Sequence, residues 1–254
     1  MFDRRKFLLA GAALSLSGCR IFDSASDSDS ALRQLFASHE GLTRSAQRAL
    51  IGDRLAPEFS EADIRQGQRP NGSTDPADAT YRQMAQSGFA DYHLTVTGLV
   101  DAPQSLSLAE LTALPSRTQI TRHDCVEGWS CIAKWQGVPL GTVLKLASPK
   151  LTARYAVFHC FDAIERSLSG EVFYYESIDL IDAFHPQTIL AYAMNGAPLP
   201  VANGAPLRLR VERQLGYKMA KYVHTIELTD SLAALGSGKG SYWADRGYEW
   251  YAGI

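Results

Sequence analysis

Hydrophobic residues recur with helical spacing in one long segment of the sequence. Between residues 32 and 51 they fall three or four positions apart, which predicts an amphipathic helix that ends at Gly52. Residues 53–80 carry scattered Pro, Gly, Asn and Asp without a clear period. We therefore expect an extended arm there, with a turn at 68–73 and a short helix at 81–87.

Beyond Gly88 the pattern changes to that of strands. Ser107, followed three residues later by Glu110, indicates a capped short helix within this region. A second short helix is expected to end near 184–186. Strand-like segments lie at 93–100, 118–125, 155–160, 189–194, 207–213 and 222–228. We expect one domain over 86–254, preceded by a helix and arm over 31–85.

The first thirty residues have the composition of an export signal and a linker. Arg4-Arg5-Lys6-Phe7-Leu8 resembles a twin-arginine signal, and Leu16-Ser17-Gly18-Cys19 resembles a lipobox. An ordinary secretory signal is the alternative. We expect a signal over 1–19, a lipid anchor on Cys19, a flexible Ser/Asp-rich tether over 20–30, and a periplasmic location.

Composition narrows the class of protein. Hydrophobic residues make up 46% of the chain, which excludes a wholly disordered protein. The 25 basic and 27 acidic residues nearly cancel, so nothing global predicts a nucleic-acid partner. No apolar run reaches the roughly 18 residues that a membrane span needs. Any basic binding site must therefore be local.

The cysteines suggest a ligand or a free thiol rather than a disulfide framework. If Cys19 carries lipid, three cysteines remain, an odd number, and no Cys-x-x-Cys pair exists. Among the histidines, none has the spacing of a zinc motif. An all-protein metal site would have to combine His123 and Cys125 with His159 and Cys160.

Cys125 stands in an unusual setting for a core cysteine. Arg122, His123 and Asp124 precede it, and Glu127 follows two residues later. We expect Arg122 and His123 to favour the thiolate, the form that binds metals and attacks electrophiles. A buried structural cysteine beside a turn is the alternative.

A second cluster is basic. Arg208 and Arg210 share one face of an alternating segment, and Arg213, Lys218 and Lys221 follow. Such a group predicts a receptor for a multiply charged anion such as phosphate, with a solvated strand face as the alternative. Further along, residues 241–251 hold five aromatic side chains, which we expect to pack over a groove or to form an interface.

Four motifs together resemble one known family. They are RHDCVEGWSCIAKWQGVPL, FHPQTILAYAMNGAPLPVANGAPLRLRV, LGYKMAKYV and YWADRGYEWYAGI. They resemble the sulfite-oxidase-like molybdopterin oxidoreductases, in particular the bacterial periplasmic branch that includes the catalytic subunit of methionine sulfoxide reductase. The resemblance covers residues 60–254. It implies an α+β, strand-rich fold around one molybdenum-molybdopterin cofactor.

The resemblance also implies roles for individual residues. Cys125 matches the metal ligand, and a soft thiolate suits a metal otherwise held by dithiolene sulfurs. Glu127 matches a carboxylate near the metal, and His123 or Trp129 lines the pocket. Cys160 stands where the branch has a threonine. The matched cofactor contacts are Asn71, Cys160, Asn203, Arg208, Met219 and Lys221.

The implied activity is two-electron oxygen-atom transfer on a small, sulfur-containing substrate. No haem-attachment motif is present, so a separate membrane cytochrome or quinol-linked protein is expected to exchange electrons with the enzyme. Two alternatives remain open. One is a metal-free lipoprotein that binds an anion or a partner on the same fold. The other is a thiol enzyme with Cys125 as nucleophile and His123 or His159 as base.

Overall fold

The computed structural model describes residues 31–254, apart from 66, 68 and 168–169. The predicted signal, lipid anchor and tether lie outside the described residues. The chain divides into two compact units, and the boundary between them falls between Gly52 and Asp53. The described part of the first is helix α2 (Ala31–Ile51), as the hydrophobic pattern predicts. Within the described residues, no helix is long and apolar enough to cross a membrane.

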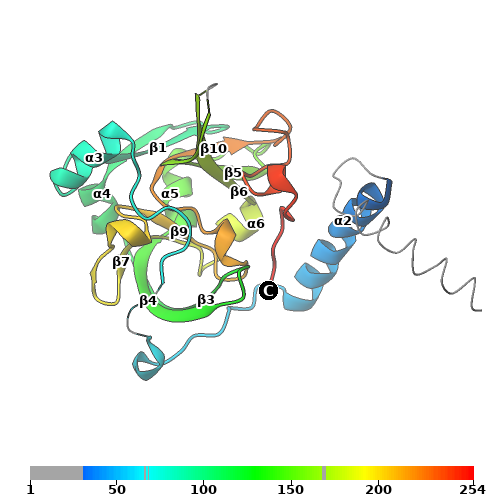
Figure 1. The fold of residues 1–254 in the computed structure, drawn as a ribbon, viewed down its shortest axis with the longest axis horizontal. Helices are drawn as coiled ribbons and strands as arrows, with labels where there is room; N and C mark the ends of the chain where they lie inside the picture. Colours follow the sequence, from blue (N-terminus) through cyan, green and yellow to red (C-terminus); the bar gives the residue numbers. More distant parts are fainter. Residues whose placement is uncertain (1–30, 66, 68, 168–169) are drawn as a thin grey trace, which may run out of the picture. The chain divides into compact units, whose positions relative to one another are not determined.

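The second unit contains two five-stranded sheets, so the predicted strand-rich α+β fold is confirmed (Figure 1). One sheet has the order β2-β1-β10-β5-β6, with β1 and β10 parallel and the other neighbours antiparallel. Its strands are β1 (His93–Gly98), β2 (Gln104–Ser107), β5 (Tyr155–Ser167), β6 (Gly170–Asp179) and β10 (Val223–Thr229).

The other sheet is antiparallel and has the order β3-β4-β7-β8, with β9 also paired to β7. Strands β3 and β4 run as one curved ribbon and are joined by the turn that carries Cys125 (Figure 1). The strands are β3 (Arg117–Asp124), β4 (Ser130–Pro139), β7 (Ile189–Met194), β8 (Ala197–Pro198) and β9 (Arg208–Arg210).

Short helices connect these strands. The predicted cap of α4 is confirmed, because the Ser107 side chain accepts a hydrogen bond from the Glu110 backbone N–H and the Glu110 carboxylate accepts one from the Ser107 backbone N–H. The α-helices are α3 (Ala79–Gln86), α4 (Leu108–Ala113), α5 (Leu140–Ala147) and α6 (Leu180–Ala183). The 3-10 helices are η1 (Glu61–Asp63), η2 (Val201–Asn203), η3 (Gly216–Lys218) and η4 (Ala244–Arg246).

Strand β9 is shorter than the alternation over 207–213 predicts. The chain turns after Val211, whose carbonyl accepts a hydrogen bond from the Gln214 backbone at 3.0 Å. Both faces of the strand are buried, including the faces of Arg208 and Arg210. A solvated strand face is therefore excluded, and each of these cations needs a partner inside the protein.

Candidate active site

A cavity of about 150 Å³ lies beside the turn between β3 and β4, and we call it the Cys125 cavity. Its wall comes from parts of the chain that are distant in the sequence: 71–73, 125–127, 162–164 with Tyr174, 217–221 and 243–248. Five of the predicted site residues line it, which are Asn71, Cys125, Glu127, Met219 and Lys221. The fold thus brings together residues from the arm and from two of the four motifs.

The turn shape places Cys125 at the cavity. Its backbone N–H donates to the Trp129 carbonyl at 2.9 Å, and its carbonyl accepts from Gly128 at 3.0 Å. Gly128 has φ +84°, a left-handed conformation that side chains disfavour. The half-buried thiol has a pKa that burial raises. The prediction that Arg122 and His123 would favour the thiolate is wrong for the protein without metal.

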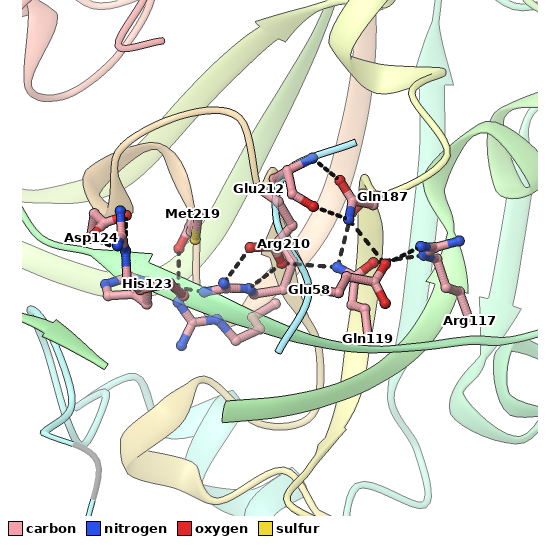
Figure 2. Close-up of polar contacts among 12 residues, drawn as sticks. Glu58, Arg117, Gln119, His123, Asp124, Gln187, Arg210, Glu212 and Met219 are labelled. Atoms are coloured by element: carbon pink, nitrogen blue, oxygen red, sulfur yellow. Dashed lines mark hydrogen bonds and ion pairs between the residues drawn. The ribbon is translucent and has the colours of Figure 1, made fainter. Parts of the chain in front are cut away.

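The reason lies in how those two neighbours are bound. Arg122 forms an ion pair with Asp124 at 2.8 Å, so its charge is already matched. His123 is buried, and Nδ1 lies 3.0 Å from Nη1 of Arg210 (Figure 2). Because a guanidinium only donates, Nδ1 accepts and Nε2 carries the proton. Burial, followed by the charge of Arg210, holds the pKa of His123 well below its ordinary value.

His123 lies behind the cavity rather than in its wall. A Cβ atom at Gly216 would come within 2.3 Å of Nε2, so this ring packs against the backbone of η3. Nε2 has no hydrogen-bond partner among the described residues. The ring centroid lies 5.5 Å from that of Trp129. His123 therefore packs between η3 and Trp129, the last residue of the Cys125 turn.

Glu127 occupies the opening of the cavity. Its carboxylate accepts a hydrogen bond from Nε1 of Trp129 at 2.9 Å and lies 3.9 Å from Arg69. The side chain is 62% exposed, so its carboxylate is in contact with solvent. The Arg69 guanidinium also lies over the Trp129 ring, 5.8 Å from its centroid. Arg69 was not identified from the sequence, because the arm has no periodic pattern that indicates its position.

The five predicted basic residues do not form one anion receptor, and this expectation is corrected. Three of them have carboxylate partners inside the fold: Arg210 with Glu212, Arg213 with Asp182, and Lys218 with Glu176. The physical reason is burial, since an unpaired charge in the interior is costly. Within the described residues, no ion pair joins the remaining two, Arg208 and Lys221, to a carboxylate.

Arg208 and Lys221 are instead held by backbone oxygens. Arg208 donates to the carbonyl of Asn203 at 2.8 Å and approaches that of Met219 at 3.5 Å. Lys221 donates to the carbonyls of Ala202, at 3.0 Å, and Ser73. Burial, followed by the charge of the neighbouring cation, lowers the pKa of Arg208 to about 9 and that of Lys221 to about 7.

This corner has donors left over for a ligand. Nε of Arg208 and Nδ2 of Asn203 are buried without hydrogen-bond partners. Gly204 packs closely here: it has φ +111°, and a Cβ would lie 2.9 Å from Cβ of Lys221. Two neighbouring cations with unused donors form a site suited to an anionic group such as phosphate.

Asp162 is a cavity residue that sequence reasoning missed. Residues 160–162 of β5 lie opposite the single residue Tyr174 of β6, a bulge that interrupts the alternation. Asp162 lines the Cys125 cavity, is 3% exposed, and has no partner for Oδ1. Burial raises its pKa to about 7, against the opposing effect of Lys221. The alternation of the strand gives no signal of such a shift.

Cys160 lies outside the wall of the Cys125 cavity. It lines a second hollow of about 520 Å³, together with Tyr174, whose side chain borders both spaces. Burial raises the pKa of this thiol well above its ordinary value. Cys125, Cys131 and Cys160 are all free thiols. The predicted contact of Cys160 with the cofactor therefore has no support from the lining of the Cys125 cavity.

The predicted packing of the aromatic segment over a groove is confirmed. Trp243 and Tyr248 line the Cys125 cavity, and their ring centroids are 5.0 Å apart. Tyr217, from η3, packs edge-on against Tyr248 at 5.3 Å. One wall of the cavity is therefore aromatic and continuous.

The residues of the cavity fit a metal ion that is bound within a cofactor, where the cofactor supplies most of the metal's ligands. No group of three or more His, Cys, Asp or Glu within the described residues could hold a metal ion. Cys125 alone cannot complete a coordination sphere, whereas Arg208 and Lys221 can hold an anionic tail. These features define a class of protein that binds its metal within an organic, anionic cofactor.

The comparisons with known proteins agree with this class. The model of the family described as "Oxidoreductase molybdopterin binding domain" matches residues 81–234, more than half of the chain. The chain belongs to this family, and it is a molybdopterin oxidoreductase.

Three relatives place the chain within the family. A putative protein-methionine-sulfoxide reductase subunit YedZ1 of Azospira oryzae is 37% identical over 99% of this chain and 86% of its own length. The catalytic subunit MsrP of Ralstonia nicotianae is 30% identical, over 91% of this chain and 70% of that protein. MsrP of Xanthomonas campestris pv. campestris is 37% identical over 57% of this chain, which spans only 47% of that relative.

One solved structure supports the fold alone. The sulfane dehydrogenase SoxCD from Paracoccus pantotrophus matches with a TM-score of 0.50 and 22% sequence identity. The match covers 56% of this chain and 39% of that one. The sulfite-oxidase-type fold class that the motifs imply is confirmed.

Proposed function

We propose that this protein reduces a small sulfoxide by two-electron oxygen-atom transfer, with a molybdenum-molybdopterin cofactor bound in the Cys125 cavity. The observation that carries the proposal is a cavity lined by both the Cys125 thiol and Lys221, whose side chain lies beside that of Arg208 at Gly204. The printed names of the relatives, protein-methionine-sulfoxide reductase subunits, favour reduction as the direction.

The chain's own residues then divide the work of holding the cofactor. Cys125 would bind the metal as a thiolate, since coordination removes the thiol proton. Arg208, Lys221 and the Asn203 amide would hold the phosphate through their unused donors. Asp162 would accept hydrogen bonds from the N–H edge of the pterin. When bound, the cofactor supplies the two-electron redox chemistry of the reaction.

Glu127 is suited to proton delivery at the opening. Reduction of a sulfoxide consumes two electrons and two protons, and it yields a thioether and water. The Glu127 carboxylate is exposed to solvent and anchored by Trp129, so it can take up protons outside and release them beside the substrate. His123 packs against Trp129 of the turn and stays neutral, so it is assigned no proton transfer.

Electrons would come from a separate protein. The relatives are named as subunits, and this sequence has no Cys-x-x-Cys-His motif for attaching a haem. A membrane cytochrome or a quinol-linked protein is the proposed donor. Residues 1–19 support export through the twin-arginine route, a lipid anchor at Cys19, and work in the periplasm.

The test is the cofactor content of the exported protein and of two variants. Wild type from a molybdenum-replete host is expected to carry about one molybdenum and one pterin per chain. Cys125→Ala is expected to lose the metal, whereas Cys131→Ala, which removes a buried thiol of β4, keeps it. The loaded wild type should oxidise a reduced dye when methyl phenyl sulfoxide is added. Well-folded wild type without molybdenum would refute the enzyme and leave a metal-free, anion-binding lipoprotein.

A further inference from the structure

The aromatic wall of the Cys125 cavity reaches the opening. Trp243 and Tyr248 line the cavity together with Val126, the residue after the proposed metal ligand. Tyr248 is 37% exposed and Val126 is 46% exposed, so both border solvent. A molecule that enters toward Cys125 would therefore pass a surface of two aromatic rings and one branched aliphatic side chain.

This wall is fixed in place by polar contacts behind it. The Tyr248 backbone N–H donates to the Trp243 carbonyl at 3.0 Å, which closes the segment into a tight loop. Arg246, within that loop, pairs with Glu165 at 2.8 Å and lies 3.6 Å over the Tyr242 ring. The Tyr217 hydroxyl donates to the Glu249 carbonyl at 2.7 Å. The rings are thus preorganised before a ligand binds.

Among the described residues, no group of cations converges at the opening to hold a small anion. Arg69, the cation nearest Glu127, has that carboxylate 3.9 Å away, so the two charges offset each other. Lys221 donates to two backbone carbonyls in the proposed phosphate corner. Recognition of an anion such as sulfite requires charged donors that converge on its oxygens. The surface near Cys125 instead matches an uncharged, apolar group.

We propose that Trp243 and Tyr248 are specificity-determining residues that bind the apolar substituent on the substrate's sulfur. The enzyme would then prefer sulfoxides with an aryl or extended alkyl group over dimethyl sulfoxide. The inference rests on the proposed function and deepens it, because it assigns substrate selection to one wall of the cavity.

The test compares methyl phenyl sulfoxide with dimethyl sulfoxide in the molybdenum-loaded enzyme. In Tyr248→Ala the ratio of their kcat/KM values is expected to fall about tenfold, mainly through KM for the aryl substrate, as for the loss of a well-packed apolar contact. Trp243→Ala should lower the ratio further. The matched control is Phe184→Ala, which removes an aromatic ring of similar exposure (40%) away from the cavity. Molybdenum content shows that each variant is folded.

A binding measurement separates this inference from the proposed function. Without reductant, the affinity of the loaded enzyme for methyl phenyl sulfoxide is measured by calorimetry, and Tyr248→Ala is expected to weaken it about tenfold. Binding that depends on Tyr248 as expected, without any turnover, would refute sulfoxide reduction but would still support the role of the aromatic wall in binding. Equal affinity and an unchanged kcat/KM ratio in loaded Tyr248→Ala would overturn the assignment of the wall.

Discussion

Asp162 and Lys221 are oppositely charged groups whose pKa values are both shifted to about 7. Burial is the main cause in each case, because it penalises the charged form of both. Each also stabilises the charged form of the other, although no ion pair between them is formed. A cavity built in this way holds two groups near the midpoint of ionisation until a ligand supplies their missing partners.

The buried carboxyl of Asp162 predicts a pH dependence of stability. Its pKa is raised from 3.8 to about 7, so the unfolded chain loses this proton at lower pH than the folded protein does. The contribution of Asp162 to stability should therefore fall between about pH 4 and pH 7, by up to about 4 kcal/mol, since each pKa unit is worth about 1.4 kcal/mol.

The measurement is the urea unfolding free energy of cofactor-free protein beside Asp162→Asn. The variant lacks the titrating group, so its stability relative to wild type should rise as the pH increases from 4 to 8. A difference between the two proteins that stays constant over this range would show that Asp162 ionises normally. Asp78→Asn, which replaces a part-exposed carboxyl, serves as the control.

Among structural elements, strands β3 and β9 are joined by a buried polar network (Figure 2). Glu212 accepts two hydrogen bonds from Arg210 and one from Gln119 of β3, at 2.9, 2.6 and 2.9 Å. Gln119 also donates to the carbonyl of Gln187, whose side chain bonds Ala56 of the arm at 2.7 Å. The network therefore links the arm to β3 and to the end of β9.

Arg210→Met should be strongly destabilising, because it leaves Glu212 buried without its counter-ion. The expected loss is about 3–5 kcal/mol in the free energy of unfolding, measured by chemical denaturation. The double variant Arg210→Met, Glu212→Leu should recover part of this loss, since it removes the stranded charge. A double variant as unstable as the single one would instead place the cost in lost packing of Arg210 against Trp135, 4.4 Å away.

The elements differ in how far the sequence predicts them. The α4 cap and α2 follow from local patterns, since each depends on residues close together in the chain. Arg210 and Lys218 form ion pairs with Glu212 and Glu176. The sequence has 27 acidic residues, and no local pattern indicates which of them each cation will contact. The bulge that turns Asp162 into the cavity arises from pairing with two other strands, which no single segment encodes.

At the scale of the whole molecule, the compact second unit begins at Asp53, well before the predicted catalytic domain. The arm supplies the 71–73 wall of the cavity, and Ser73 accepts hydrogen bonds from both Lys221 and Tyr222. From α3, the buried Tyr81 hydroxyl donates to the Ala205 carbonyl at 2.7 Å. The arm and α3 are therefore structural parts of the site.

Two truncations test this boundary. A chain that begins at Asp53 should keep its molybdenum content and a Tm close to that of the full chain. A chain that begins at Gln86 loses Tyr81 and the 71–73 wall, so its Tm should fall by about 10 °C and its cofactor content should collapse. Thermal unfolding and metal analysis check both. Retention of cofactor by the shorter chain would show that the arm is dispensable.

The enclosure of one cavity by several distant segments has a consequence for how long a cofactor stays bound. A cofactor held by 71–73, 125–127, 162–164, Tyr174, 217–221 and 243–248 is expected to leave most readily when some of these parts of the chain separate. The rate of cofactor dissociation is then limited by the rate of local opening of the fold. The bound cofactor also lowers the population of the opened state, so it protects each of these segments from proteases. The bound cofactor would then stabilise the second unit. The time for which it stays bound would be a measure of how slowly the folded protein opens, which is its kinetic stability.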